Sequence, residues 1–260
     1  MTSFLSGSTR AQSPILVLGA TGGIGHGAVE ALLERNYPVV AVARRRERLS
    51  ALLAHFDGRG SLTTVEGSVS DDPSAAALAQ AVRELPRPPV AVIVSVMGPI
   101  ERGRLLDQPA DFLGRKLRQD VAVHLHAARH LLPELAAIGR PSRYLVIGGP
   151  CGDAPWSSYG HLSVAAAALR MLVQVLRAET NGAPVRVQQL YVESPVRTIR
   201  NRTCACPEWP DALSVGRRAV DLLEESESTE TIVRYRPVSI HAFARRPVAV
   251  QGHSARIRSE

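Results

Sequence analysis

Short apolar runs alternate with segments of helical spacing along nearly the whole chain. The run 14–19 has no polar side chain, and the segment after it repeats Ala28, Leu32 and neighbouring apolar residues on one helical side. Such alternation is typical of a parallel sheet with helices on both faces. It predicts an α/β, single-domain, Rossmann-like doubly wound parallel sheet of about seven strands. We expect strands at 14–19, 38–43, 61–66, 89–96, 142–148, 184–191 and 230–235, and helices at 27–35, 46–55, 73–84, 109–131, 158–179 and 210–224.

The length and the distribution of these elements predict one folded unit. A chain of 260 residues can form one large α/β domain with a substantial core. We expect this domain to cover 13–240, after a flexible N-terminus at 1–12 and before a basic C-terminal tail at 241–260. We see no internal repeat and no linker long enough to divide the chain.

Composition limits the classes of partner and location. No apolar run reaches the length of a membrane span, and 1–12 lacks the apolar core of a signal peptide, so we expect a cytoplasmic protein without a membrane partner. The net charge is +7, but the basic residues form no stripe interleaved with aromatic side chains, so we expect no nucleic-acid partner. The three cysteines form no disulfide framework. We expect Cys204 and Cys206 to be loop cysteines, with a metal-binding or oxidisable pair as the alternative, and we predict no metal site.

A glycine-rich segment joins the first expected strand to the first helix. It contains Gly19, Thr21, Gly23, Ile24 and Gly25. Glycines here permit a tight turn and let backbone amides approach a pyrophosphate at the positive end of the helix. The position in an alternating chain favours dinucleotide binding, although a tight turn without a ligand is the alternative.

The end of the second expected strand indicates which dinucleotide is preferred. A carboxylate at this point binds the ribose 2′-hydroxyl of NAD in dinucleotide-binding folds. This chain has Arg44 and Arg45 instead, and a guanidinium can bind a 2′-phosphate through two hydrogen bonds. NADP(H) is therefore favoured over NAD(H), with a solvated helix start as the alternative for the two arginines.

These motifs together resemble the short-chain dehydrogenase/reductase family over about 13–240. Gly19, Gly23 and Gly25 match the family's GxxxGxG pattern, and the segment 195–198 resembles the family's proline-led segment beside the nicotinamide. The resemblance implies further cofactor contacts from the adenine-side segment 68–71, from the end of strand four and from the nicotinamide-side segment. These contacts fall on Ser68, Val69, Ser95 and Thr198.

The family's catalytic Asn, Ser, Tyr and Lys are all replaced. Counted from Glu179, which ends the helix pattern, the Tyr and Lys positions hold Leu162 and Ala166, and the Ser position holds Gly149. Counted from Pro133, the Asn position holds Asp120. No lysine follows Lys116 anywhere in the chain, so the family's tyrosine–lysine acid–base pair is excluded independently of this alignment.

Four side chains are candidates to replace that chemistry. Asp120 takes the asparagine position, and His161 stands next to the lost tyrosine and can titrate near pH 7. Tyr159 lies about one helical turn earlier, and Glu193 is either a site acid or an obstacle to the cofactor. His161 has a helix-start histidine as its alternative interpretation. Lys116, Asp120 and His124 are spaced four residues apart, a pattern that usually forms a surface ion-pair stripe.

Three functions remain open from the sequence. The first is an atypical family member that binds NADP(H) and catalyses a non-redox step such as cyclisation, dehydration or isomerisation. The second is an NADPH-dependent oxidoreductase with a replaced proton donor; the third is a non-catalytic nucleotide sensor or partner subunit, and a cofactor-free chain also remains open. We favour an atypical enzyme on a small apolar or aromatic substrate, bounded by Met97, Trp156, Leu162 and Trp209, and the apolar helix 158–179 favours a homodimer or homotetramer.

Overall fold

The computed structural model describes residues 13–226 and 228–236, and within them the seven strands form one parallel sheet. The spatial order is β3-β2-β1-β4-β5-β6-β7. The strands β2 and β3 are added on one side of β1, and the connection from β3 to β4 crosses to the other side, so the strand order reverses between β1 and β4. The strands are β1 (Ile15–Leu18), β2 (Val39–Ala43), β3 (Leu62–Glu66), β4 (Ala91–Val94), β5 (Ser142–Gly148), β6 (Val185–Val192) and β7 (Ile232–Tyr235). This confirms the doubly wound α/β prediction. The predicted segments 1–12 and 241–260, and the domain end at 237–240, lie outside the described residues.

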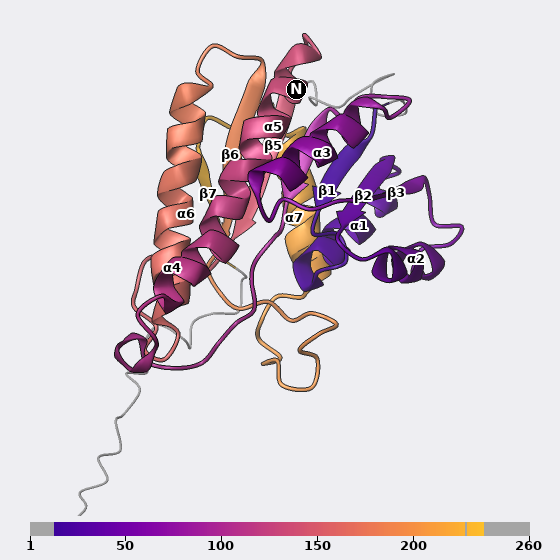
Figure 1. Cartoon of the computed structure of the whole chain (residues 1–260). Coiled ribbons are helices and arrows are strands. Elements are labelled where there is room, and N and C mark those ends of the chain that lie inside the picture. Colours follow the sequence, from indigo (N-terminus) through magenta and orange to yellow (C-terminus); the bar gives the residue numbers. More distant parts are fainter. Residues whose placement is uncertain (1–12, 227, 237–260) are drawn as a thin grey trace, which may run out of the picture.

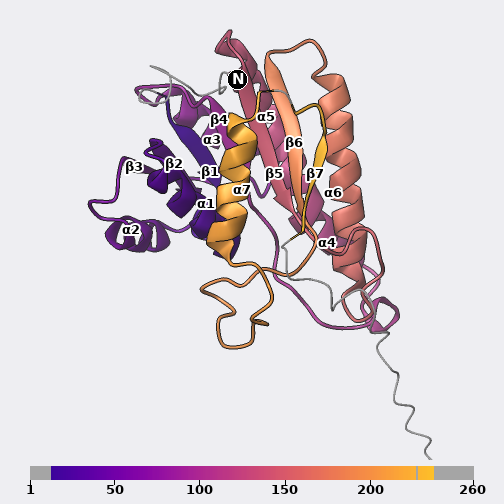
Figure 2. The same ribbon diagram turned by 180° about the vertical axis from the view of Figure 1, so that it is seen from behind.

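Helices cover both faces of the sheet (Figures 1 and 2). One face carries α1, α2 and α7, whereas α3, α5 and α6 cover the other. The helices are α1 (Gly23–Glu34), α2 (Arg46–His55), α3 (Asp72–Arg83), α4 (Phe112–Leu117), α5 (Val123–Ala137), α6 (Gly160–Glu179) and α7 (Ala212–Glu224), with a short 3-10 turn η1 (Leu105–Asp107) and a π-helical turn η2 (Arg118–Ala122). The connections at the carboxyl ends of the strands, including the long one between β6 and α7, gather at one edge, the lower edge in Figure 1.

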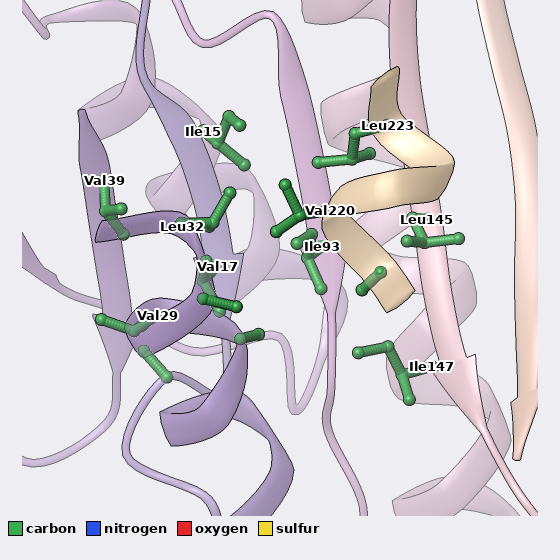
Figure 3. Close-up of a cluster of buried hydrophobic side chains, with 14 of the residues drawn as sticks. Ile15, Val17, Val29, Leu32, Val39, Ile93, Leu145, Ile147, Val220 and Leu223 are labelled. Atoms are coloured by element: carbon green, nitrogen blue, oxygen red, sulfur yellow. The ribbon is translucent and has the colours of Figure 1, made fainter. Parts of the chain in front are cut away.

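The apolar strand residues divide between two cores because successive side chains point to opposite faces. Ile15 and Val17 pack under α1 and α7, whereas Leu16 and Leu18 pack under α3 and α5. Figure 3 shows the first core, in which strand residues meet Val29 and Leu32 of α1 and Val220 and Leu223 of α7. Burial on both faces explains why these strands are apolar throughout rather than alternating.

Two glycines let α1 and α7 approach very closely. A Cβ atom on Gly27 would lie 2.2 Å from the carbonyl oxygen of Ala212, and one on Gly216 would lie 2.2 Å from the carbonyl oxygen of Gly27. Real side chains never approach backbone oxygens this closely, so neither position accepts even a methyl group without a shift of a helix. The backbones of α1 and α7, the first and last described helices, are therefore in direct contact.

The helix predicted at 109–131 differs from the structure in three ways. It begins at Phe112, it is interrupted by the π-helical turn η2, and it continues to Ala137 past Pro133. Pro133 is exposed, so the carbonyl group that loses its hydrogen-bond partner stays solvated, while the buried Leu131 and Leu135 on either side anchor the helix to the core. Here tertiary packing overrides the helix-breaking tendency of proline.

The helix α6 has both a buried and an exposed apolar side. Leu169 and Val173 are buried in the core, whereas Val164, Met171 and Val175 are exposed. In the described part of the chain, α6 alone is long and apolar enough to cross a membrane by length and composition, contrary to our expectation that no apolar segment reaches that length. Its buried side packs against the sheet, with Leu169, Val173 and Leu176 in the second core.

Candidate functional site: a cleft lined by arginines at the carboxyl edge of the sheet

A cleft of about 540 Å³ lies where β1, β2 and β4 end. This is the point at which the strand order reverses, and ligands of open α/β sheets bind in that crevice. Its walls come from the glycine turn, the start of α2, the segments after β3 and β4, and η2. The lining includes Gly19, Thr21, Gly22, Arg44, Arg45, Arg48, Ser68, Val69, Ser70, Ser95, Val96, Met97, Gly98, Pro99, Arg118, Gln119 and Arg200.

The glycine turn forms one wall of the cleft and requires glycine at two positions. Gly19 has φ +77°, and a Cβ atom there would lie 2.2 Å from the carbonyl oxygen of Ser95 at the end of β4. A Cβ atom on Gly25 would lie 2.1 Å from the carbonyl oxygen of Gly19. The turn therefore exposes backbone at the start of α1, as a pyrophosphate-binding turn requires.

Five arginines and no described acidic residue line this cleft. Arg44, Arg45 and Arg48 stand at the end of β2 and in the first turn of α2, Arg118 lies in η2, and Arg200 comes from the connection after β6. None of the five forms a salt bridge with a described residue, although many other arginines of the chain do. Uncompensated positive charge on one cleft attracts a ligand with several negative charges.

Arg200 reaches across the glycine turn from the opposite side. Its Nη2 donates a hydrogen bond of 2.7 Å to the carbonyl oxygen of Thr21, and burial together with Arg48 lowers its pKa. Asn201 fixes this segment, because its Oδ1 accepts hydrogen bonds from the backbone nitrogen and Oγ1 of Thr198. A phosphate between Arg48 and Arg200 would relieve the repulsion between them.

If the cleft binds NADPH, as the sequence predicts, we expect Arg200→Met to weaken that binding about five- to tenfold, or roughly 1 kcal/mol, because one charged hydrogen-bond donor is lost from the cleft. Calorimetric titration measures the change. Arg202→Met is the matched control, since Arg202 is an exposed arginine of the same connection that does not line the cleft. Equal affinities for the two variants would contradict a contact between Arg200 and the ligand.

The other predicted cofactor residues divide into two groups. Ser68, Val69 and Ser95 line the cleft together with Gly19 and Thr21, whereas Gly23, Ile24, Gly25 and Thr198 do not. Thr198 instead packs on the turn from outside: a Cβ atom on Gly23 would lie 2.8 Å from its Cβ. The sequence did not single out Arg48, Arg118 or Arg200. Arg48 follows Arg44 by one helical turn, which was a usable signal, but only the folded connection brings Arg200 to the cleft.

Two of the four predicted catalytic side chains are engaged elsewhere or enclosed. The carboxylate of Glu193 binds Arg234 at 3.0 Å and Arg236 at 2.5 Å, and these hydrogen bonds lower its pKa, which disfavours proton donation. His161 is fully buried, and its two ring nitrogens have no hydrogen-bond partner among the described residues. Burial and Lys116 lower the pKa of His161.

The other two candidates differ in their hydrogen bonding: Tyr159 has an unbonded hydroxyl among the described residues, whereas Asp120 binds the backbone beside the cleft. Tyr159 is the half-buried N-cap residue of α6, and its hydroxyl makes no hydrogen bond with a described residue. Asp120 is 5% exposed in η2, and its Oδ1 accepts a hydrogen bond of 2.7 Å from the backbone nitrogen of Gly98. Asp120 thus lies directly behind the cleft wall.

The expected surface stripe of Lys116, Asp120 and His124 is wrong. All three side chains are buried, with exposed fractions of 0%, 5% and 1%. Regular spacing places them on one side of the helix, but that side faces the segment after β4 rather than solvent. The three residues therefore belong to the surroundings of the cleft.

The positions of the missing tyrosine and lysine carry no polar group. The connection after β5 packs against Ala166, since a Cβ atom on Gly152 would lie 3.3 Å from the Cβ of Ala166. Ser163 Oγ accepts a hydrogen bond of 2.9 Å from the backbone nitrogen of Trp156 and so ties the same connection to α6. In the described part of the chain, Leu162, Trp156 and Trp209 do not line the cleft, whereas Met97 does.

Comparison with known proteins identifies the family. A family model described as short chain dehydrogenase matches residues 13–199. The chain is 26% identical to a short-chain dehydrogenase/reductase of Pestalotiopsis fici over 184 residues, which are 70% of this chain and 73% of that protein. A short-chain oxidoreductase of Pseudomonas aeruginosa PAO1, described as containing an atypical catalytic center, has a similar structure, with a TM-score of 0.76, 21% identity and coverage of 90% of this chain and 99% of that chain. For the NADPH-bound structure of such an oxidoreductase from that organism, the TM-score is 0.74 and the identity 21%, with coverage of 88% and 98%. The match of the family model over most of the described residues shows that the chain belongs to the short-chain dehydrogenase family.

Proposed function

We propose that this chain binds NADP(H) in the arginine-lined cleft. The observation that carries the proposal is a cleft beside a turn that has no room for a Cβ atom at Gly19 or Gly25, with five arginines and no acidic residue among its described lining residues. Arg44 and Arg45 would hold the 2′-phosphate, and the turn at Gly19 would hold the pyrophosphate. A bound NADPH supplies a hydride to such a site. The NADPH-bound structure of the Pseudomonas aeruginosa oxidoreductase supports the same cofactor type.

Titration of the purified chain with NADPH, NADP⁺ and NADH tests this proposal. We expect micromolar binding of NADPH, at least tenfold tighter than NADH, because only NADPH carries the 2′-phosphate. Arg44→Ala is expected to weaken NADPH at least tenfold, or about 1.4 kcal/mol, and to leave NADH unchanged. Arg46→Ala is the matched control, since Arg46 is an exposed neighbour outside the cleft lining. Failure of both NADPH and NADP⁺ to bind would contradict the proposal.

We further propose that the reaction does not use a tyrosine–lysine pair. Leu162 and Ala166 offer no proton, and Glu193 is held by two arginines. A non-redox step on a bound small molecule is favoured, as in cyclisation, dehydration or isomerisation. Reduction with another proton donor is the second candidate, which is supported by Tyr159, because its hydroxyl makes no hydrogen bond with a described residue.

Stoichiometry distinguishes these reactions. A reductase consumes one NADPH for each carbonyl reduced, and Tyr159→Phe would lower its kcat if the hydroxyl donates the proton. A non-redox enzyme converts its substrate without a net change in NADPH absorbance at 340 nm. Binding of NADPH without conversion of any substrate class would favour the nucleotide sensor or partner subunit.

The remaining proposals concern the substrate class, the oligomeric state and the location of the protein. A small apolar or aromatic substrate is supported by Met97, which is 59% exposed and lines the cleft. A homodimer or homotetramer is supported by the exposed apolar residues Val164, Met171 and Val175 of α6, together with Leu125 of α5. The cytoplasmic location, without nucleic-acid or membrane partners, stays a prediction from the sequence.

A further inference from the structure

The wall of the cleft after β4 is held from behind by three buried side chains. His124 Nε2 lies 3.1 Å from the carbonyl oxygen of Val96, and Asp120 Oδ1 accepts the 2.7 Å hydrogen bond from the backbone nitrogen of Gly98. Lys116 Nζ donates to the carbonyl oxygen of Pro99. Each contact comes from a successive turn of the helix and reaches a successive part of the segment 96–99. We call these three side chains the buried ladder.

The segment gripped by the buried ladder is part of the proposed nucleotide site. Val96, Met97, Gly98 and Pro99 all line the cleft. This segment continues β4 and borders the glycine turn, since the carbonyl oxygen of Ser95 lies where a Cβ atom of Gly19 would point. A displacement of 96–99 would therefore change the shape of the cleft without any direct contact between the ladder and a ligand.

Burying the charged side chains of the ladder costs stability, so packing alone does not explain them. Lys116 is the chain's only lysine and is fully buried; its Nζ lies 3.7 Å from Asp120 Oδ2 and 3.8 Å from Glu101 Oε1. Removing two charges from water carries a large desolvation penalty, and apolar replacements of a buried pair are often equally stable or more stable. A costly polar arrangement behind a cleft is typical of a functional site, where shape matters more than stability.

We propose that Lys116, Asp120 and His124 are positioning residues that fix the segment 96–99 and thereby set the affinity of the cleft for NADP(H). This inference rests on the proposed function for its ligand, but its structural part does not. The π-helical turn η2 contributes, because it carries Asp120 between the helices of Lys116 and His124. Such turns occur frequently at functional sites.

The first test measures the hydrogen bond between Asp120 and the backbone of Gly98, in the absence of a nucleotide. Hydrogen exchange of the Gly98 amide, followed by NMR, reports whether Asp120 accepts its proton. We expect Asp120→Ala to accelerate this exchange at least tenfold, whereas Asp120→Asn keeps an acceptor oxygen at the same place and retains most of the protection. An unchanged rate in Asp120→Ala would overturn the proposal.

The second test separates positioning from stability. The double variant Lys116→Met/Asp120→Asn removes both charges together and leaves no unpaired ion. We expect a melting temperature equal to or above that of the unaltered chain, but an NADPH Kd at least fivefold weaker, because the carbonyl group of Pro99 is released. Arg115→Met is the matched control: Arg115 pairs with Glu101 beside Lys116 and does not line the cleft, so NADPH affinity should not change.

The outcomes are distinguishable from a failure of the proposed function. If the double variant folds and binds NADPH as tightly as the unaltered chain, the positioning role is wrong. If it loses stability and affinity in parallel, the ladder is merely structural, which also overturns the proposal. If the unaltered chain binds no NADPH, the proposed function fails, and the Gly98 exchange still decides whether the ladder holds the segment.

Discussion

Gly27→Ala is expected to lower the free energy of unfolding by about 3 kcal/mol, with a melting temperature about 10 °C lower. The new methyl group would be placed 2.2 Å from the carbonyl oxygen of Ala212. Neither partner can move alone, because Gly27 lies in α1, Ala212 starts α7, and both helices are packed on the sheet. The helices must separate, and separation exposes Val29, Leu32, Val220 and Leu223, which share one core (Figure 3).

Gly114→Ala is the matched control for this prediction. Gly114 also lies in a helix, but a Cβ atom there would approach only the Arg118 guanidinium, at 3.7 Å. Alanine has the higher helix propensity, so this variant should be unchanged or more stable by up to about 1 kcal/mol. Urea unfolding of both variants measures the difference. A Gly27→Ala protein as stable as the Gly114→Ala protein would contradict the close contact of α1 and α7.

The second large effect is a loss of stability in acid that depends on His124. Burial lowers the pKa of His124 to about 4, from 6.5 for an unperturbed histidine. Between these two values the unfolded chain binds a proton that the folded chain does not, so stability falls as the pH falls. The contribution of His124 is complete above pH 6.5 and is lost by about pH 4. Its size is of order 3 kcal/mol, because each pKa unit corresponds to 1.36 kcal/mol.

His124→Gln isolates this contribution. The glutamine Nε2 can replace the donor to the carbonyl oxygen of Val96 but does not titrate. We expect the free energy of unfolding of the variant to depend less steeply on pH between 6.5 and 4, while His26 and His161, whose pKa values are also lowered, act in both proteins. Urea unfolding at several pH values measures the two slopes. Parallel pH profiles would show that His124 is not the group that titrates.

The sheet could be predicted from the sequence because its strands are apolar on both faces. The strand predicted at 142–148 has the observed bounds, and most other strands differ by one or two residues at an end. The first helix begins at Gly23 rather than at the predicted position 27, because its first turn contains two glycines and only one apolar side chain, Ile24, which is too few to produce a helical pattern. Periodicity detects the side chains that pack, and it misses turns made only of backbone.

The candidate site was only partly predictable for a different reason. The glycine turn with Arg44 and Arg45 is contiguous with a strand end, so the sequence located that side of the cleft. The spacing of Lys116, Asp120 and His124 correctly indicated one helical side, but spacing does not tell which side faces inward. That depends on the packing of 96–99 against the helix, which is a contact between distant segments. Arg200 was missed because it reaches the cleft only through the folded connection after β6.

The seam between α1 and α7 has a consequence for how the chain is made. Near the glycine contact, Arg217 of α7 pairs with Glu34 at 2.9 Å, and the hydroxyl of Tyr37 donates to Glu224 at 2.7 Å. All these partners are separated by more than 180 residues, so most of the chain must be synthesised before the contacts between α1 and α7 can form. Contacts of such long range slow folding. A nascent chain that ends before α7 would present the apolar side of α1 to solvent, where chaperones bind.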